Sequence, residues 1–209
     1  TGLTVNAAVT AGGAVTVANS GIFTTIAAGT ISSTGVFGQS GAGANSLGGN
    51  ISVTGTGNAL SFAQAITLTD NITLTSTNGA VSFAKVVDIA TSSAARSLTV
   101  TAGSGGVTFT EAVGATKALA DVTVNSTGLT RLGSSVGAAS LTTNAGGSVE
   151  LNGNVTTSGA QTYNDAVILA TNVALTSTSN GNVSFGSTLN SAAALVATPA
   201  TLTITAGTG

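Results

Sequence analysis

The most regular feature of the chain is the alternation of large apolar residues with small polar ones. Residues 72–75 read Ile-Thr-Leu-Thr, and the same order returns at residues 98–101, 122–124 and 202–205. A period of two with many β-branched residues predicts strands that bury one face and expose the other. Clusters of Gly, Asn, Ser and Ala, which suit tight corners, punctuate the strands at residues 76–79, 102–106, 145–147 and 179–181. We therefore expect an all-β chain of short strands.

Helical patterning is weak throughout. The best candidate is the Ala-rich stretch 191–197, and Pro199 follows it closely. Proline cannot continue a helix beyond its first turn. We interpret this stretch as a loop or bulge between strands.

The chain contains a long internal repeat. Residues 59–77 resemble residues 160–178, and both copies run into a Val-Ser-Phe segment, at 81–83 and 183–185. The offset between the copies is 101 residues before the intervening turn and 102 after it. Internal repetition of this kind is typical of solenoids and other repeat architectures.

A shorter period lies inside the long one. One large residue closes the second strand of each unit, at Phe62, Phe83, Phe109, Leu132, Leu151, Tyr163 and Phe185. The steps between them are 21, 26, 23, 19, 12 and 22 residues, with a mean of 20.5. We assign the 12-residue step to a shortened coil near residues 154–157.

This period predicts a β-solenoid of about 20 residues and three short strands per coil, in roughly ten coils. The three strand types are represented by 98–100, by 81–83, and by 65–68 or 166–169. Each strand would pair in parallel with its equivalents on adjacent coils, about 4.8 Å away. A β-sandwich is the main alternative, but it does not predict an apolar column at coil spacing.

Composition removes several kinds of chemistry. Only ten of the 209 residues are charged, the net charge is −2, and Cys, His, Met and Trp are absent. Thiol and imidazole chemistry, the usual zinc ligands and disulfides are therefore excluded. Four basic residues argue against nucleic-acid binding, and no apolar run approaches the length of a membrane-spanning helix.

The acidic residues do not form a recognisable site. They are isolated in the sequence, without an Asp-Asp or Asp-x-Asp pair, at Asp70, Asp88, Glu111, Asp121, Glu150 and Asp165. Glycoside cleavage needs two cooperating carboxylates, and the Gly-Gly pairs lack the Gly-x-Asp of calcium-loaded solenoids. We expect no catalytic, cofactor-binding or metal-binding residues, and a carbohydrate-active β-helix enzyme is a lesser alternative.

The repeats resemble a known family. Residues 159–167 (Gly-Ala-Gln-Thr-Tyr-Asn-Asp-Ala-Val) and 98–109 are similar to repeats of giant bacterial surface exoproteins of the filamentous haemagglutinin type. The resemblance covers nearly all of the chain, as a style of repeat. It implies a right-handed parallel β-helix that acts as a structural rod or stalk of a secreted or cell-surface adhesin or extracellular fibre. It also implies an extracellular location. A glycan or cell-surface receptor is a further partner to consider, and no residue of the sequence marks a binding face for one.

Residues 1–209 are expected to form one β-solenoid segment, a fragment of a longer repeat protein. Residues 3–5 and 202–204 read as ordinary coil strands, so we expect open ends that meet further coils of the same chain or end-to-end copies. Lys85 and Glu111 each follow a column residue by two positions, which predicts an exposed ion pair between adjacent coils worth about 0.2–1 kcal/mol.

A ladder of outward threonines supports one functional alternative, an ice-binding solenoid. The predicted outward positions are Thr73, Thr75, Thr99, Thr101, Thr123, Asn125, Thr142, Asn144, Ala174, Thr176, Thr203 and Thr205. Columns about 7 Å apart along the strand, on coils about 4.8 Å apart, could order water. The competing interpretation is that Thr favours exposed strand positions and pairs with itself across a sheet. Unequal coil lengths and the interruptions by Ala and Asn favour that interpretation.

Overall fold

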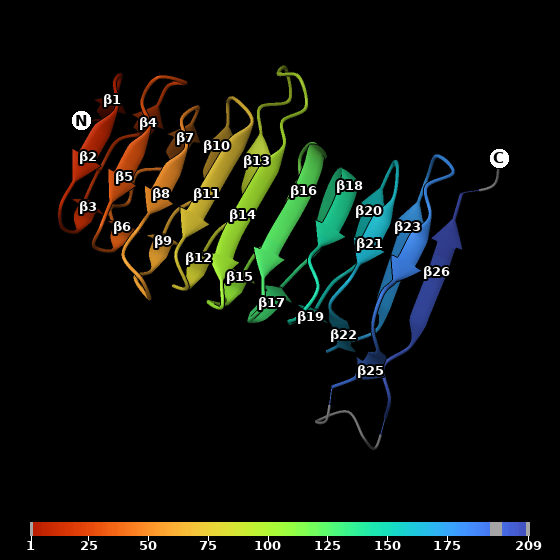
Figure 1. Cartoon of the computed structure of the whole chain (residues 1–209). Helices are drawn as coiled ribbons and strands as arrows, with labels where there is room; N and C mark the ends of the chain where they lie inside the picture. The colour runs from red at the N-terminus through yellow and green to blue at the C-terminus, as the bar shows by residue number, and fades with distance from the viewer. Residues whose placement is uncertain (1, 193–197, 208–209) are drawn as a thin grey trace.

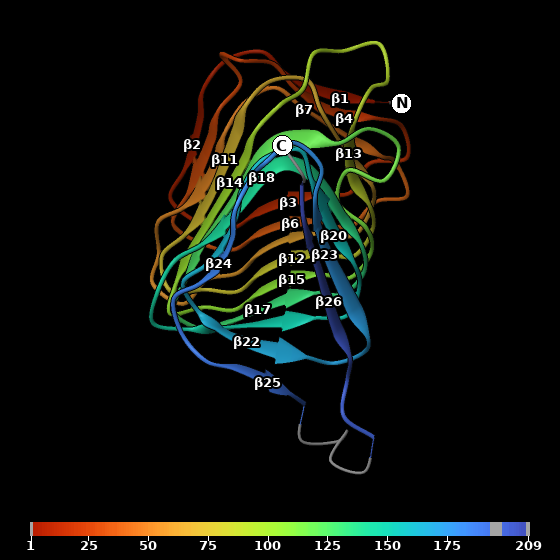
Figure 2. The same cartoon turned by 90° about the vertical axis from the view of Figure 1, so that its right-hand side faces the viewer.

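The protein is a β-solenoid in which every strand pairing is parallel. The computed structural model describes residues 2–192 and 198–207. The chain makes about nine turns of about 22 residues, close to the expected ten turns of 20. Figure 1 shows the turns following one another from the N-terminus to the C-terminus, and Figure 2 shows three faces surrounding one interior. The described residues contain strands and turns but no helix, so none that could cross a membrane.

Three faces follow from the pairing of successive turns. The first face contains β1 (Leu3–Val5), β4 (Phe23–Thr25), β7 (Asn45–Leu47), β10 (Ile66–Leu68), β13 (Val87–Ile89), β20 (Val155–Thr157), β23 (Val173–Ser177) and β26 (Leu202–Ala206). The second contains β2 (Val9–Ala11), β5 (Ile31–Ser33), β8 (Ile51–Val53), β11 (Ile72–Ser76), β14 (Leu98–Gly103), β16 (Leu119–Ser126), β21 (Gln161–Tyr163) and β24 (Val183–Phe185). The third contains β3 (Val15–Val17), β6 (Phe37–Gln39), β9 (Leu60–Phe62), β12 (Val81–Phe83), β15 (Val107–Phe109), β17 (Leu129–Leu132), β19 (Ser148–Leu151), β22 (Ala166–Leu169) and β25 (Leu189–Ser191).

One long strand joins the first two faces. β18 (Val136–Thr143) pairs through its N-terminal half with β20 and through its C-terminal half with β21. Isolated bridges from Val87 to Val113 and from Val113 to Val136 continue the first face from β13 to β18. The second face therefore merges with the later strands of the first face into one twelve-stranded sheet.

The predicted apolar column is confirmed for five of its members. Phe62, Phe83 and Phe109 are direct register partners on the third face, and Leu132 and Leu151 continue the column. All five are at most 1% exposed. The ring centroids of Phe62 and Phe83 lie 5.9 Å apart, and those of Phe83 and Phe109 lie 4.5 Å apart. Val81, Val107 and Val149 are buried on the same face.

Two members of the predicted column lie elsewhere. Leu151 pairs with Leu169, so Leu169 takes the place assigned to Tyr163. Tyr163 and Phe185 belong to β21 and β24 on the second face, where their rings stack with centroids 5.4 Å apart. Val183 lies beside them on β24. The predicted shortened coil is therefore wrong, because residues 155–157 form β20 of a full turn.

Equivalent strands in the two copies of the long sequence repeat lie on different faces of the solenoid. At about 22 residues a turn, an offset of 101 residues is not a whole number of turns. The first copy supplies β9, β10 and β11 to the third, first and second faces, whereas the second copy supplies β21, β22 and β23 to the second, third and first. Hence 65–68 and 166–169, expected to be equivalent, lie on different faces.

The corners of the two copies nevertheless share a conformation. Asn78 and Asn180, which are equivalent in the repeat, have positive φ angles of 62° and 58°. Asn tolerates this left-handed region better than most residues. The following glycine is also required at the first corner, because a Cβ on Gly79 would lie 1.9 Å from the carbonyl oxygen of Asn58. The unit that keeps its conformation in both copies is therefore a strand with the corner that follows it, and this unit occurs on different faces of the solenoid.

The edges of the stack are open, as expected. Within residues 2–192 and 198–207, β1, β2 and β3 each pair with one neighbour only, and so do β24, β25 and β26. No helix or crossing strand covers either edge in this part of the chain. Leu3, Val9 and Ile204 are 44%, 39% and 46% exposed as a result. Of the stretch interpreted as a loop or bulge, residues 193–197 lie outside the described residues.

The Phe stack generates a stability prediction. Replacing Phe83 by Ala removes a ring that touches two other rings, and we expect a loss of about 3–5 kcal/mol in the free energy of unfolding. Phe185→Ala is the matched control, because that ring is half-buried and stacks on one ring, so its loss should be smaller. Urea unfolding followed by circular dichroism measures both. Equal losses would contradict the proposed contribution of the stack.

Candidate functional site

The carboxylates are dispersed, and each has its own partner. Glu111, Asp70 and Glu150 pair with Lys85 (2.9 Å), Arg96 (3.8 Å) and Arg131 (3.0 Å). Asp121 accepts hydrogen bonds from the hydroxyls of Ser97 and Ser140. No hydrogen bond or ion pair in the described part of the chain joins two carboxylates.

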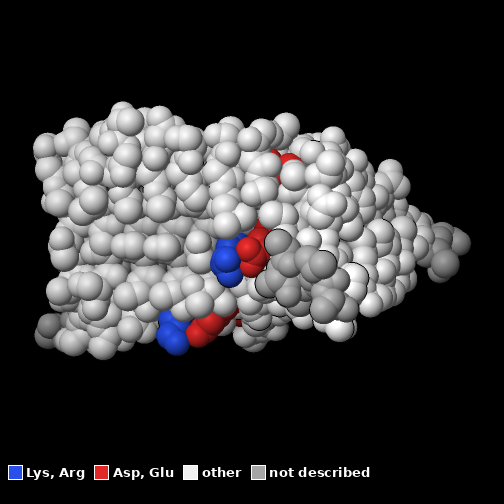
Figure 3. All heavy atoms as spheres, turned by 90° about the horizontal axis from the view of Figure 1, so that it is seen from below, with Lys and Arg blue, Asp and Glu red and all other residues white. Residues whose placement is uncertain are grey.

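The ion pairs join adjacent turns of the solenoid. The predicted contact between Lys85 and Glu111 is confirmed at 2.9 Å, with both side chains partly exposed. Arg131 and Glu150 are direct partners in the pairing of β17 with β19. In Figure 3, basic and acidic side chains lie next to each other midway along the rod, and the surface toward the N-terminal end is uncharged. Exposed pairs of this kind contribute little stability and leave little local net charge.

Asp88 organises a loop. Its carboxylate accepts hydrogen bonds from three backbone N–H groups, those of Ile89, Thr116 and Lys117. The Lys117 ammonium group donates in turn to the carbonyl oxygens of Thr91 and Ser93. Asp88 therefore holds the segment at Thr116 and Lys117 next to β13.

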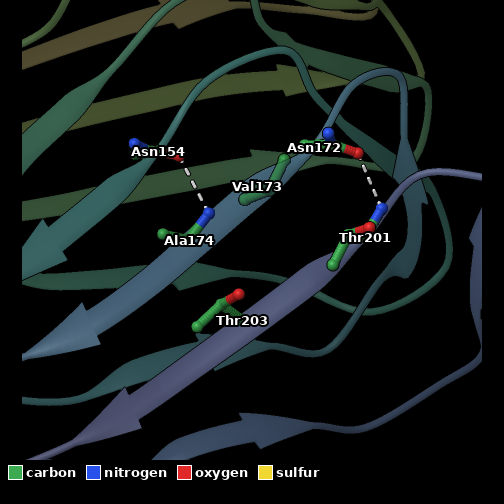
Figure 4. A pocket seen from close by; sticks show the side chains of 6 residues that line it. All are labelled: Asn154, Asn172, Val173, Ala174, Thr201 and Thr203. Carbon is green, nitrogen blue, oxygen red and sulfur yellow. Dashed lines mark hydrogen bonds between the residues drawn. The ribbon is translucent and has the colours of Figure 1, made fainter.

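A metal site requires a cluster of side chains that could hold the ion. Among the residues that the structure describes, no group of three or more Asp or Glu side chains could hold an ion. The surface hollow in Figure 4, about 440 Å³ in volume, is lined by Asn154, Asn172, Val173, Ala174, Thr201 and Thr203. Its side chains are uncharged.

Asparagines in this hollow connect one turn to the next. The side-chain oxygen of Asn154 accepts a hydrogen bond from the backbone N–H of Ala174, and that of Asn172 accepts one from Thr201, both at 2.8 Å (Figure 4). Asn50 and Asn71 make the same contact, to Thr73 and Ser97. Each of the four directly precedes a strand, in the pattern Asn-Ile or Asn-Val. That pattern is the sequence signal for this role, and the alternation of apolar and polar positions does not point to it.

Buried amides form a polar cluster near the N-terminal end. Gln39 is 2% exposed and donates to the side chain of Asn19 and to the carbonyl oxygen of Gly41, both at 2.9 Å. Its side-chain oxygen accepts from the backbone N–H groups of Ala63 and Gln64. The cluster therefore provides hydrogen-bond partners for backbone groups at a corner. Buried polar groups require such partners.

A second buried cluster surrounds Tyr163. The Tyr163 hydroxyl donates to the side-chain oxygen of Gln161 at 3.0 Å. Burial raises the pKa of this phenol far above its usual range. The Gln161 amide donates to the carbonyl oxygen of Thr176 at 3.0 Å. A buried phenol hydroxyl needs a hydrogen-bond partner, and Gln161 provides it.

Asp165 is the more deeply buried of the two buried carboxylates that form no ion pair in the described part of the chain, the other being Asp88. Asp165 is 1% exposed, and its Oδ1 accepts from the backbone N–H of Gly147 at 2.8 Å. Its Oδ2 lies buried without a hydrogen bond of ordinary geometry, as does the hydroxyl of Thr143. Burial raises the pKa of the Asp165 carboxyl, against the lowering by the Gly147 and Thr143 groups.

The outward threonines occupy two faces rather than one. Thr73, Thr99, Thr123 and Thr142 are successive register partners on the second face. In contrast, Ala174 pairs with Thr203 and Thr176 pairs with Thr205 on the first face. The sequence predicted a single ladder, and this is wrong. The structure has an array on the second face and a separate, shorter set on the first face that contains Ala174 and Thr176 with their partners Thr203 and Thr205. The reason is that the second copy of the sequence repeat lies one face away from the first copy.

The comparisons with known proteins are negative. No protein-family model, no curated protein and no solved structure matches this chain.

The buried Asp165 generates a pH prediction. Its folded pKa is raised above the ordinary 3.8, so the unfolded chain ionises first as the pH rises. Folding stability contributed by this group therefore falls as the pH rises above about 4, until the folded pKa is passed. Asn at this position cannot ionise.

We expect Asp165→Asn to match the unmodified chain in stability near pH 3 and to exceed it near pH 7. Urea unfolding across that range measures the difference. Asp70→Asn is the control, because it removes an exposed carboxylate paired with Arg96 and should give no such gain. A constant difference at all pH values would contradict the role assigned to burial.

Proposed function

We propose that the chain is a structural rod or stalk segment of a secreted or cell-surface bacterial adhesin or extracellular fibre. The observation that carries the proposal is the unbroken parallel pairing of about nine turns along one axis. Such a stack holds its two ends apart at a fixed distance, which is what a spacer requires. The similarity of the repeats to filamentous haemagglutinin-type exoproteins supports the same function and an extracellular location, with a glycan or cell-surface receptor as partner.

The interior of the rod supports a mechanical function. Each turn adds large apolar residues to one continuous core, from Phe23 in the second turn to Leu175 near the end. A single turn cannot bury its own apolar residues, so the stability of a solenoid comes largely from the contacts between neighbours. Length can therefore be increased turn by turn without a change in the core.

The two edges also fit the function of an extendable rod. At the N-terminal edge, Leu3 and Val5 direct their backbone groups toward β4, through Leu3 N–H to Ile22 and Ile26 N–H to Val5. The groups of Thr4, between them, are left for the opposite side. At the other edge, Val173 N–H donates to Thr201, which leaves the groups of Leu202 and Ile204 outward. Another turn, from the same chain or a second copy, finds complementary donors and acceptors there.

Removal of one whole turn tests the proposal. Deleting residues 63–83 joins Phe62 to Ala84, and Phe62 and Phe83 are register partners. The remaining strands keep their faces, so we expect a folded rod that is shorter by about 4.8 Å. Small-angle X-ray scattering measures the length, and circular dichroism measures the fold.

Deleting residues 63–73 is the matched control, because it removes about half a turn and brings non-equivalent positions together. We expect this variant to lose its cooperative unfolding transition. Two results would overturn the proposal. One is unfolding of the whole-turn deletion, and the other is polysaccharide hydrolysis by the intact chain that is lost when a carboxylate such as Glu150 is changed to its amide.

A further inference from the structure

The second face carries a double row of outward, uncharged polar side chains over β11, β14 and β16, whereas on the first face only β23 and β26 carry two outward side chains. Its central strands β11, β14, β16 and β18 contain 5, 6, 8 and 8 residues, whereas the strands of the third face contain three or four. Two outward positions therefore fit on β11, β14 and β16, and the second-face half of β18 contributes one, Thr142. One row contains Thr73, Thr99, Thr123, Thr142 and Thr162, and the other contains Ser52, Thr75, Thr101 and Asn125.

The rows stay aligned although the turns differ in length. The register pairs Thr73 with Thr99, then Thr123 and then Thr142, across steps of 26, 24 and 19 residues. The extra residues lie in the corners and loops, for example in the segment between β13 and β14. Unequal turns therefore leave both rows in register as far as Thr101 and Asn125, and the pairing of β14 with β16 shifts only beyond them, between Thr101 and Gly103. Ala174 does not interrupt the array because it lies on another face.

The hydroxyls of the array are available to solvent. Thr73 is exposed, and Thr75, Thr99, Thr101 and Thr123 are half-buried. Within the described part of the chain, the hydroxyls of Thr73, Thr75, Thr99 and Thr123 make no hydrogen bond to another residue. Neither row contains a charged residue. The nearest acid along β16, Asp121, is held by the hydroxyls of Ser97 and Ser140 at the border of the array.

We propose that this face of the rod binds ice. Strand geometry sets the array at about 7 Å along the strands and about 4.8 Å across them, a repeat comparable to that of the ice lattice. Each Thr presents a hydroxyl that can hold a water molecule and a methyl group that cannot hydrogen-bond. The backbone ladder beneath fixes the spacing of the residues that carry the hydroxyls. A charged macromolecule would find no complementary charge in either row.

Thermal hysteresis and ice-recrystallisation inhibition by the intact chain are the primary measurements. We expect both activities, and we expect Thr99→Tyr to abolish them, because a bulky ring in the centre of one row prevents contact with a flat crystal. Ser82→Tyr is the matched control. Ser82 is the half-buried outward residue at the centre of β12 on the third face, so the same ring there should leave the activities unchanged.

Thermal unfolding followed by circular dichroism verifies that both variants keep the fold. A second variant, Thr123→Tyr, repeats the test one turn along the row and should also abolish activity. Absence of both activities in the intact chain would overturn the inference, as would equal losses in Thr99→Tyr and Ser82→Tyr. Neither result affects the proposal of a rod, because that proposal depends on the pairing of turns rather than on this face.

Discussion

The structure depends on one constraint, the in-register parallel hydrogen bonding of every turn to the next. A three-residue strand has no stability of its own, and each strand obtains its partners only from the turns on either side. The ladder therefore decides which residues may vary. Within strands the side chains must alternate inward and outward, so the lengthening of individual turns is confined to corners and loops. The same ladder aligns the Phe rings inside and the hydroxyl rows outside.

At the corners, backbone N–H and C=O groups lie outside the ladder and need other hydrogen-bond partners. Polar side chains of the neighbouring turn supply these partners. Asn154 and Asn172 do so at the surface, and Gln39 and Gln161 do so inside. These residues explain how a chain so poor in charge still contains many polar groups with a defined structural role.

The internal repeat shows which unit of structure was duplicated. Because the two copies are displaced by one face, the unit that keeps its conformation is a strand with its corner, as the shared backbone of Asn78 and Asn180 indicates. A solenoid with three similar faces accepts such a module on any of them. The outer surfaces change as a consequence, since outward residues of one copy join a different face in the other.

The sequence by itself determined the strand type, the parallel stacking, the core column from Phe62 to Leu151, and the pairing of Lys85 with Glu111. These features are local or depend on one step of the repeat, so alternation and spacing are sufficient to predict them. Tertiary structure alone decided the face to which each strand belongs, and hence the positions of Tyr163 and Ala174 and the continuity of the hydroxyl rows. Because the turns differ in length, the face of a strand can be found only by counting the corners that precede it. One unrecognised corner therefore assigns every later strand to the wrong face. The burial of Asp165 was equally invisible in the sequence, because a corner residue points inward or outward according to the neighbouring turn.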